Sequence, residues 1–314
     1  MTTAVATDSA KRALLDHLID DASLFPPRGL PMRAALRHHA RHSESAYPWI
    51  GGRFVLPASR ADEFATTRAD GDPIALSVIL DAATRGAKGD VVRADLHRVE
   101  RLRVLPGVSV ESLELRLPGG LDAAGLERAV AAVTTSFGGS EIALWIEGDY
   151  DAGWRLAPDE TMSLLAQTRS AAPAQLTLGA KVRCGGARPG STPPAEDLAS
   201  FVVAAQAAGV PWKATAGLHH PVRTVRGGTP MHGFLNLFVA GTLLHAGALE
   251  PARVAAVLAE TDARAFVVDP MHVGWRDARV DAEAIAAARA HCVSYGSCSF
   301  DEPVNDLREL GILL

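Results

Sequence analysis

Two lysines in short apolar segments are the residues of this chain whose type and placement suggest chemistry. Lys213 lies in the segment 210–221, which reads Val-Pro-Trp-Lys-Ala-Thr-Ala-Gly-Leu-His-His-Pro, a pattern typical of a short buried strand ending near Gly217. Lys181 lies in a similar segment, 176–183. A buried ammonium group is costly unless it is paired or loses its proton, and a neutral amine can attack a carbonyl carbon to form a Schiff base. The structural alternative is a lysine whose stem covers the strand end while its ammonium reaches water or a carboxylate.

The charged residues of the other segments strengthen the chemical interpretation. In a barrel of parallel strands, alternate residues face inward, and those near the carboxyl ends line the active site. The inward positions near the strand ends are polar on five expected strands; they are Glu114, Arg116, Glu147, Lys181, Arg183, Lys213, Thr215 and Asp269. A second cation beside Lys213 and partial desolvation would both favour the neutral amine. A structural ion-pair network is the alternative.

The segments that position these residues alternate regularly between predicted strands and helices. We expect strands at 53–57, 74–81, 108–117, 141–147, 176–183, 211–216, 263–269 and 292–295. Eight βα units in about 260 residues, with no linker between them, favour a single (β/α)₈ TIM barrel over a doubly wound sheet, which would carry a glycine-rich turn after its first strand. We therefore expect a helical N-terminal extension over residues 1–50 and an α/β barrel over residues 51–314.

The composition excludes several other classes of protein. The chain has 314 residues, 48% of them hydrophobic, and a formal net charge of −5. No basic run is interleaved with aromatic residues, so we expect no nucleic-acid partner. The apolar run 234–244 is shorter than a membrane span and residues 1–10 lack a secretory pattern, so we expect a cytoplasmic protein without a membrane partner. The 3 cysteines lack CxxC spacing, which argues against a disulfide framework and a structural zinc site.

Two of the expected strands resemble a known family. Lys181-Val182, followed on the next strand by Lys213-Ala-Thr-Ala-Gly217, is similar to the paired strand motifs of deoxyribose-phosphate aldolase, one of which reads Lys-Thr-Ser-Thr-Gly. The resemblance implies a class I aldolase-like lyase that forms a Schiff base on Lys213 with a small carbonyl metabolite, phosphorylated metabolites included, and that needs no cofactor. The chain differs on the expected seventh strand, where residues 266–272 replace the family's segment with a second lysine.

The chain as a whole resembles a group of bacterial (β/α)₈-barrel proteins. The shared segments read Asp-Asp-Ala-x-Leu-Phe-Pro-Pro, Lys-Ala-Thr-Ala-Gly-Leu-His-His-Pro, Met-His-Gly-Phe-Leu-Asn and Gly-Ser-Cys-Ser-Phe-Asp-Glu-Pro. This second resemblance implies the barrel and no particular activity.

These observations lead to a set of expected site residues. We assign catalysis to Lys213, Lys181, Glu147, Asp269 and His219, with Glu147 or His219 moving protons. We assign substrate contacts to Arg183, Thr215, Arg116, Glu114, His220, His232, Asn236 and Ser297. The partner is then a small-molecule substrate, and a homo-oligomer is compatible with the sequence.

Two other functions remain open at this point. In the first, a divalent metal ion held by His219, His272, Glu147 and Asp269 polarises a carbonyl or generates hydroxide, as in a metal-dependent lyase or hydrolase. In the second, the barrel binds a ligand without catalysis.

Two further segments have simpler interpretations. The predicted helix 31–43 has a basic, histidine-rich face that includes His38, His39 and His42. We interpret it as a solvated face, because the spacing does not keep two histidines beside a carboxylate. Backbone amides in the segment 296–303 could cradle a phosphate, but its acidic residues favour a helix N-cap at Asp301.

Overall fold

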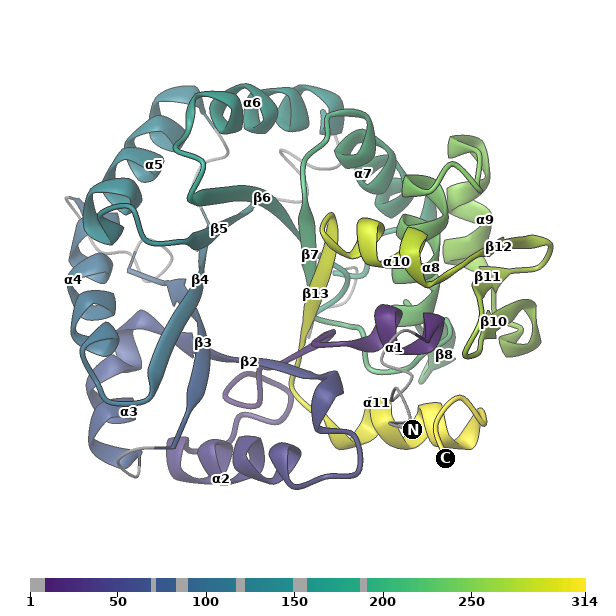
Figure 1. Ribbon diagram of the computed structural model, residues 1–314, viewed down its shortest axis with the longest axis horizontal. Coiled ribbons are helices and arrows are strands. Elements are labelled where there is room, and N and C mark those ends of the chain that lie inside the picture. The colour runs from purple at the N-terminus through teal and green to yellow at the C-terminus, as the bar shows by residue number, and fades with distance from the viewer. Residues whose placement is uncertain (1–8, 69–71, 83–89, 117–121, 149–156, 187–190) are drawn as a thin grey trace, which may run out of the picture.

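Eight parallel strands form a closed barrel in the computed structural model, which describes residues 9–68, 72–82, 90–116, 122–148, 157–186 and 191–314. The strands follow one another around the barrel in the order β1-β13-β7-β6-β5-β4-β3-β2. Their bounds are β1 (Ile19–Asp21), β2 (Gly51–Pro57), β3 (Ile74–Leu80), β4 (Val108–Arg116), β5 (Ile142–Glu147), β6 (Leu176–Arg183), β7 (Trp212–Thr215) and β13 (Cys292–Ser297). Helices surround the strands (Figure 1). The predicted (β/α)₈ barrel is confirmed.

The helices of the outer ring begin where the sequence offers capping residues. Asp90, Asp122 and Asp281 each accept a hydrogen bond from a backbone N–H in the first turn of their helix, which satisfies a donor that the helix itself cannot. The helices are α1 (Ala10–Leu15), α2 (Met32–Ser43), α3 (Ala61–Thr67), α4 (Val91–Arg103), α5 (Ala123–Phe137), α6 (Pro158–Ala171), α7 (Ala195–Ala207), α8 (Phe234–His245), α9 (Val254–Ala259), α10 (Ala282–Arg289) and α11 (Asp301–Glu309). Short 3₁₀ helices lie at Pro48–Ile50, Ala58–Arg60, Pro251–Arg253 and Ala263–Ala265.

The first barrel strand lies in the part of the chain that we expected to be an extension. β1 pairs with β13 on one side, through Ile19 opposite Tyr295, and with β2 on the other. The N-terminal 50 residues therefore supply a strand that closes the barrel, and the boundary at residue 50 is corrected. We did not predict β1 from the sequence because this strand has only three residues, of which Asp20 and Asp21 are acidic.

The expected seventh strand, residues 263–269, is not part of the barrel. Its residues Phe266–Val268 form β10, which pairs with β11 (Val273–Trp275) and, through it, with β12 (Ala278–Val280) in an antiparallel sheet. This small sheet projects from the barrel beside α9 (Figure 1). The expected strand is confirmed only over Phe266–Val268, since Ala263–Ala265 form a 3₁₀ helix. A short turn pairs β10 with the next segment of the chain rather than with a barrel strand.

Correcting both strands changes the position of each lysine in the barrel. Counted from β1, Lys181 lies on the sixth strand and Lys213 on the seventh, where we expected the fifth and the sixth. The difference that we noted on the expected seventh strand is therefore corrected, because the seventh strand of the barrel is β7, which carries Lys213.

The connection between β7 and β13 is the longest in the barrel and contains the apolar run 234–244. It includes a hairpin of β8 (Thr224–Arg226) and β9 (Thr229–Met231), then α8 and α9, the small sheet and α10. Every residue of α8 from Phe234 to Leu244 is buried. No helix among the described residues is long and apolar enough to cross a membrane.

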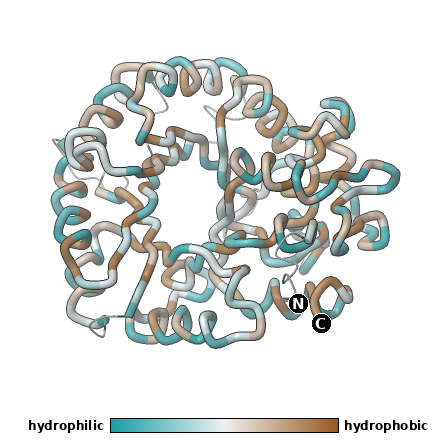
Figure 2. Tube along the Cα trace, in the orientation of Figure 1, coloured by the Kyte–Doolittle hydropathy of each residue, from teal (hydrophilic) through white to brown (hydrophobic). Residues whose placement is uncertain are grey.

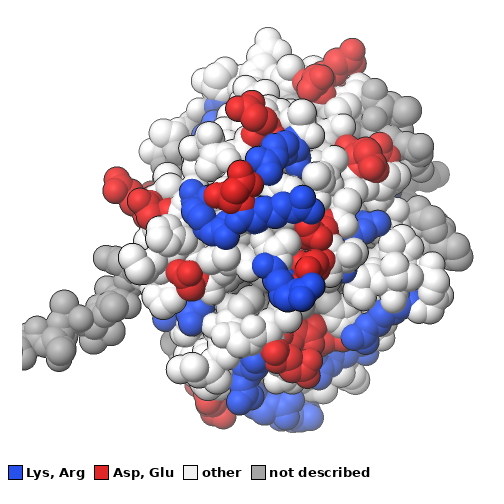
Figure 3. Space-filling view, turned by 90° about the vertical axis from the view of Figure 1, so that its right-hand side faces the viewer, with Lys and Arg blue, Asp and Glu red and all other residues white. Residues whose placement is uncertain are grey.

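Hydrophobic side chains fill the layer between strands and helices. On β3, Leu76, Val78 and Leu80 alternate with other residues and are all buried, which is the pattern of a strand packed against helices on its outer face. Hydrophobic and hydrophilic residues alternate around the helical ring (Figure 2). Acidic and basic side chains are interspersed on the face turned toward the viewer in Figure 3, with no field of one sign.

Candidate functional site

Lys181 and Lys213 lie side by side inside the barrel. They are register partners on β6 and β7, and both are almost completely buried. The strands end close together because Gly217, which follows β7 with a φ of 75°, has no Cβ; a Cβ there would lie 2.7 Å from the Cα of Gly185 in the loop after β6. The two ammonium groups therefore have fixed positions in the lumen.

One carboxylate bridges the two lysines. Glu114 on β4 places Oε1 2.7 Å from Nζ of Lys213 and Oε2 2.6 Å from Nζ of Lys181. The hydroxyl of Ser77 donates to Glu114 Oε1 over 2.7 Å, and the hydroxyl of Ser112 donates to that of Ser77. Each carboxylate oxygen is thus held by a lysine, and the orientation of the carboxylate is fixed from a third side.

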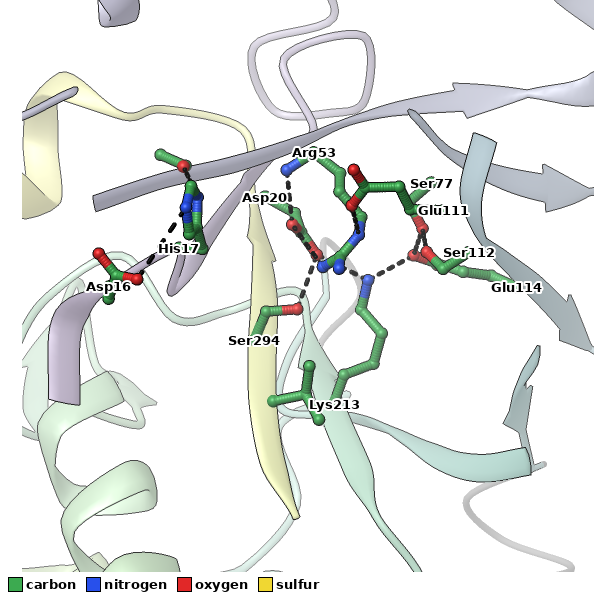
Figure 4. Close-up of polar contacts among 12 residues, drawn as sticks. Asp16, His17, Asp20, Arg53, Ser77, Glu111, Ser112, Glu114, Lys213 and Ser294 are labelled. Carbon is green, nitrogen blue, oxygen red and sulfur yellow. Dashed lines mark hydrogen bonds and ion pairs between the residues drawn. The ribbon is translucent and has the colours of Figure 1, made fainter. Parts of the chain in front are cut away.

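The second partner of Lys213 comes from β1. Asp20 Oδ2 lies 2.8 Å from Lys213 Nζ and also accepts a hydrogen bond from the hydroxyl of Ser294 on β13. The other oxygen, Oδ1, accepts a 2.8 Å hydrogen bond from the backbone N–H of Arg53 on β2. Figure 4 shows Lys213 extending between Asp20 and Glu114. Closure of the barrel by β1 therefore completes this ion pair.

The second partner of Lys181 lies at the mouth of the barrel. Glu147, the last residue of β5, places Oε2 2.7 Å from Lys181 Nζ and binds Arg183 through Oε1, at 2.9 Å. The side chain of Arg183 is 43% exposed, whereas the lysines and carboxylates below it are buried. The lumen thus holds charges of alternating sign, in the order Asp20, Lys213, Glu114, Lys181, Glu147 and Arg183.

The charged lumen differs from that of most (β/α)₈ barrels, which is packed mainly with branched aliphatic side chains. Removing several charges from water is expensive even when they are paired, and aliphatic residues of similar volume often stabilise a fold at least as well. A demand for stability alone therefore does not explain the charged lumen, which favours a chemical role.

The electrostatics keep the carboxylates ionised. Burial alone would raise their pKa values, but neighbouring cations reverse the effect: Lys213 and Arg53 lower the pKa of Asp20, Lys181 and Lys213 lower that of Glu114, and Lys181 and Arg183 lower that of Glu147 to about 2. Burial would lower the pKa of Lys181, but Glu114 and Glu147 raise it instead. Lys181 is therefore a protonated cation, as expected of the group beside Lys213.

The lowered pKa values predict a loss of stability in acid. A carboxyl group whose pKa is lower in the folded state binds fewer protons there than in the unfolded state, so its contribution is present above its unfolded pKa of about 4 and is lost as the pH falls toward the folded pKa. We expect the free energy of unfolding, measured by urea denaturation, to fall from pH 6 to pH 3. The slope should be smaller in Glu147→Gln. An unchanged slope in Glu147→Gln would show that ionised Glu147 does not contribute to stability at neutral pH.

Thr215, Arg116 and Ser297 lie at strand ends near the lumen. Thr215 has the inward parity of Lys213 and is partly buried, and Arg116 is exposed at the end of β4. Ser297 is buried, and its hydroxyl donates to the backbone oxygen of Ser299. Thr215 and Arg116 are thus within the expected region, whereas the hydroxyl of Ser297 is already used within its own loop.

His219 and His220 lie on the rim rather than in the lumen. His219 Nδ1 is 3.3 Å from Glu302 Oε2, and His220 Nδ1 is 2.6 Å from Asp306 Oδ2, both on α11. Together with Asp301 they line an open hollow of about 810 Å³ at the carboxyl ends of β1, β7 and β13. Proton transfer by His219 to a group on Lys213 therefore has no support in this geometry.

His232 and Asn236 stabilise the loop that leads into α8. His232 Nε2 donates to the backbone oxygen of Pro193 over 2.7 Å, and burial lowers its pKa to about 4. Asn236 accepts from the backbone N–H of Arg223 and donates to the backbone oxygens of Val257 and Glu260. Their hydrogen bonds are made within the protein, so our assignment of substrate contacts to them is corrected.

Asp269 and His272 do not join the site. They lie in the turn between β10 and β11, where Asp269 Oδ1 accepts from the backbone N–H groups of Met271 and His272. These hydrogen bonds to the backbone lower the pKa of Asp269. The catalytic role of Asp269 is therefore corrected, because the segment that we took for a barrel strand lies outside it. The four expected metal ligands, His219, His272, Glu147 and Asp269, do not form a cluster within the described residues.

The sequence did not lead us to Asp20, Ser77, Ser112 and Ser294, which complete the lumen network. Ser77 and Ser294 have inward parity on strands that we did predict, so applying period 2 to small hydroxyl residues as well as charges would have found them. Asp20 gave a weaker signal, an Asp-Asp pair before a run that ends in two prolines.

The histidines of α2 are not a solvated face. Arg33, Arg37 and Arg41 are exposed as expected, but His38 and His42 are buried and face Asp21, the neighbour of Asp20 on β1. Burial lowers the pKa of His42 to about 4. Our interpretation was wrong because the carboxylate comes from a strand that we had not predicted.

Neither the cysteines nor the last turn offers an additional reactive group. Burial raises the pKa of Cys184 and of Cys292 to about 12, so neither is a thiolate at neutral pH. The helix α11 begins at Asp301, and the first-turn N–H of Glu302 donates to the hydroxyl of Ser299, which places the cap before Asp301.

Comparison with known proteins finds a distant structural likeness. No protein-family model matches the chain, and no curated protein matches its sequence. Among solved structures, the chain is similar to deoxyribose phosphate aldolase from Aeropyrum pernix, which is described as a tetramer. The identity is 14%, the match covers 97% of this chain and 96% of that one, and the TM-score is 0.49. No residue role follows from a likeness at this identity.

Proposed function

We propose that this protein is a class I aldolase-like lyase whose Lys213 forms a Schiff base with a small carbonyl compound. The observation that supports the proposal best is the pair of buried lysines joined through one carboxylate at the carboxyl end of a closed barrel. Glu114 and Asp20 both lie within hydrogen-bond distance of Lys213 Nζ, so either can accept the proton that the ammonium must lose. Lys181 supplies the neighbouring cation.

The proposed chemistry needs the groups that the lumen provides. The neutral amine of Lys213 attacks the carbonyl carbon, the carbonyl oxygen takes up protons and leaves as water, and a protonated imine remains. The imine then accepts the electron pair of an adjacent carbon–carbon or carbon–hydrogen bond and becomes an enamine. In carbon–carbon cleavage, a carboxylate removes the proton of the hydroxyl group as it becomes the carbonyl of the leaving aldehyde. We assign these proton transfers to Glu114, which contacts Lys213, and to Glu147, the other carboxylate bound to Lys181.

The substrate would enter beside Arg183. The partly exposed guanidinium is anchored to Glu147 and can also bind an anionic group, so a phosphorylated or carboxylated carbonyl compound suits this mouth. The imine itself would form deeper in the barrel, where water is excluded.

An exchange experiment tests this proposal without knowledge of the natural substrate. An enamine gains and loses a proton at the carbon next to the imine, so the protein in D₂O should exchange the α-hydrogens of acetaldehyde, acetone, hydroxyacetone or pyruvate, as followed by NMR. We expect exchange of at least one of these compounds by the wild type and none above background by Lys213→Met. Binding of a compound without any exchange would instead favour a non-catalytic, ligand-binding barrel.

A further inference from the structure

A second buried polar cluster lies outside the lumen, between β1 and α2. Asp20 points into the barrel, whereas Asp21 points outward to the helix, as expected for successive residues of a strand. Oδ2 of Asp21 lies 3.7 Å from Nδ1 of His38 and 3.7 Å from Nδ1 of His42. All three side chains are buried, with His38 and His42 one turn apart on the same face of α2.

The cluster leaves polar atoms without partners. Nδ1 of His38 and Nε2 of His42 are buried and make no hydrogen bond among the described residues. A separation of 3.7 Å is too long for a hydrogen bond to Asp21. A buried, unsatisfied polar atom costs about 1–3 kcal/mol. The Nδ1 of His38 is such an atom and also faces Asp21, so it indicates a missing partner between these two side chains.

The spacing of the three side chains suits a metal ion. Ligand atoms about 2.0–2.1 Å from a tetrahedral zinc ion lie about 3.3–3.4 Å apart, so the separations from Asp21 need to contract by only a few tenths of an ångström. One ligand atom from each of Asp21, His38 and His42 can be chosen so that all lie within 4.8 Å of one another. Histidines four residues apart on a helix, with a carboxylate from another element, are a common set of zinc ligands.

Neighbouring groups hold these side chains in place. Asp21 Oδ1 accepts a 2.9 Å hydrogen bond from the backbone N–H of Ser23, which leaves Oδ2 toward the histidines. Asp301 Oδ2 lies 3.3 Å from Nε2 of His38, where a carboxylate would orient an imidazole that ligates through Nδ1. Arg28 also contacts this Nε2, at 2.8 Å, but its side chain is exposed and can turn away.

A third histidine, His39, and the ring of Phe300 also lie next to the cluster of Asp21, His38 and His42. His39 contacts Asp21 Oδ2 at 3.3 Å, is less buried and falls outside the three-ligand set. The ring of Phe300 stacks on His42 with 4.1 Å between centroids, which shields that side of the cluster from water.

We propose that Asp21, His38 and His42 bind one divalent transition-metal ion of the zinc class, with a water molecule completing the coordination. Two imidazoles favour zinc, cobalt or nickel over magnesium and calcium, which prefer oxygen ligands. The ion would fasten the three-residue strand β1 to α2 and so support Asp20 beside Lys213. Its role is structural, and the site is separate from the lumen.

Metal titration of untagged protein, first stripped with a chelator, tests this proposal. We expect one equivalent of Zn²⁺ to bind and to raise the melting temperature, and one equivalent of Co²⁺ to give visible absorption bands of a four-coordinate ion. X-ray absorption of the zinc protein should show two imidazoles at about 2.0 Å. Wild-type protein that binds no ion at one equivalent, or a spectrum without imidazole ligands, overturns the proposal, and neither result depends on a variant.

Substitutions then locate the site. His38→Gln, His42→Gln and Asp21→Asn should each weaken Zn²⁺ binding by about 100-fold or more, and Asp301→Asn by about 10–100-fold. His39→Gln should change binding only a few-fold, and His97→Gln on the exposed face of α4 should not change it. Unaltered affinity in both His38→Gln and His42→Gln would place the ion elsewhere. The exchange experiment on Lys213, run in a chelator, addresses the proposed function independently.

Discussion

Replacing Glu114 by alanine is expected to lower the free energy of unfolding by about 3–5 kcal/mol, the cost of removing one partner from a buried ion pair. The effect should lie at the upper end of this range, because Glu114 is bonded to both Lys181 and Lys213 and its loss leaves two neighbouring ammonium groups facing each other. The conservative variant Glu114→Gln keeps the volume and the hydrogen bond from Ser77, so it should lose less. Urea unfolding at pH 7 gives the free energy of unfolding of the wild type, Glu114→Ala and Glu114→Gln.

Glu111 provides a matched control on the same strand. It lies three residues earlier on β4, its side chain is 42% exposed, and it pairs with Arg53 at 3.0 Å. Exposed ion pairs contribute about 0–1 kcal/mol, so Glu111→Ala should cost little. A cost for Glu114→Ala as small as that for Glu111→Ala would show that Glu114 does not balance the charges in the lumen.

Most of the barrel could be predicted from the sequence because its strands are apolar and alternate with amphipathic helices. Seven of the eight barrel strands fell within or close to the expected ranges. β1 could not be found in this way, since a strand of three residues shows no periodicity, and two of its residues are acidic. Its place depends on closure of the barrel between β2 and β13, which is a property of the whole fold.

The lumen network could be predicted where inward parity and strand ends coincide. Glu114, Glu147, Lys181, Arg183 and Lys213 were expected to converge, and the structure brings them into contact. Asp20 was missed together with β1. Asp269 was included because residues 263–269 have the composition of a barrel strand, and only the pairing of β10 with β11 shows otherwise.

The histidine cluster shows how one unrecognised strand changes the interpretation of another element. The spacing of His38 and His42 on a helix was visible in the sequence. Without β1 no carboxylate was available opposite this face, so solvent was the only neighbour that the pattern offered. Asp21 connects the two buried clusters, because Asp20 and Asp21 are adjacent residues that point to opposite sides of the same strand.

Loss of imine formation in Lys213→Arg is the second large effect that we expect. Arginine keeps a positive charge near Asp20 and Glu114, so the fold should persist, but guanidinium remains protonated at any practical pH and cannot attack a carbonyl. Removing a covalent nucleophile typically reduces turnover by about 10⁴–10⁶-fold, so α-hydrogen exchange should fall to background. Lys181→Arg is the matched control: it keeps the neighbouring cation and leaves Lys213 available.

Borohydride trapping followed by peptide mapping is the most direct test of the Schiff base. Reduction of an imine formed with a short aldehyde or ketone should increase the mass of the protein by that of the compound less one oxygen atom, with the modification on Lys213. Trapping should be absent in Lys213→Arg and preserved in Lys181→Arg. An adduct on Lys181 would exchange the roles of the two lysines. An adduct confined to exposed amines, equal in amount in wild type and Lys213→Arg, would contradict a Schiff base in the lumen.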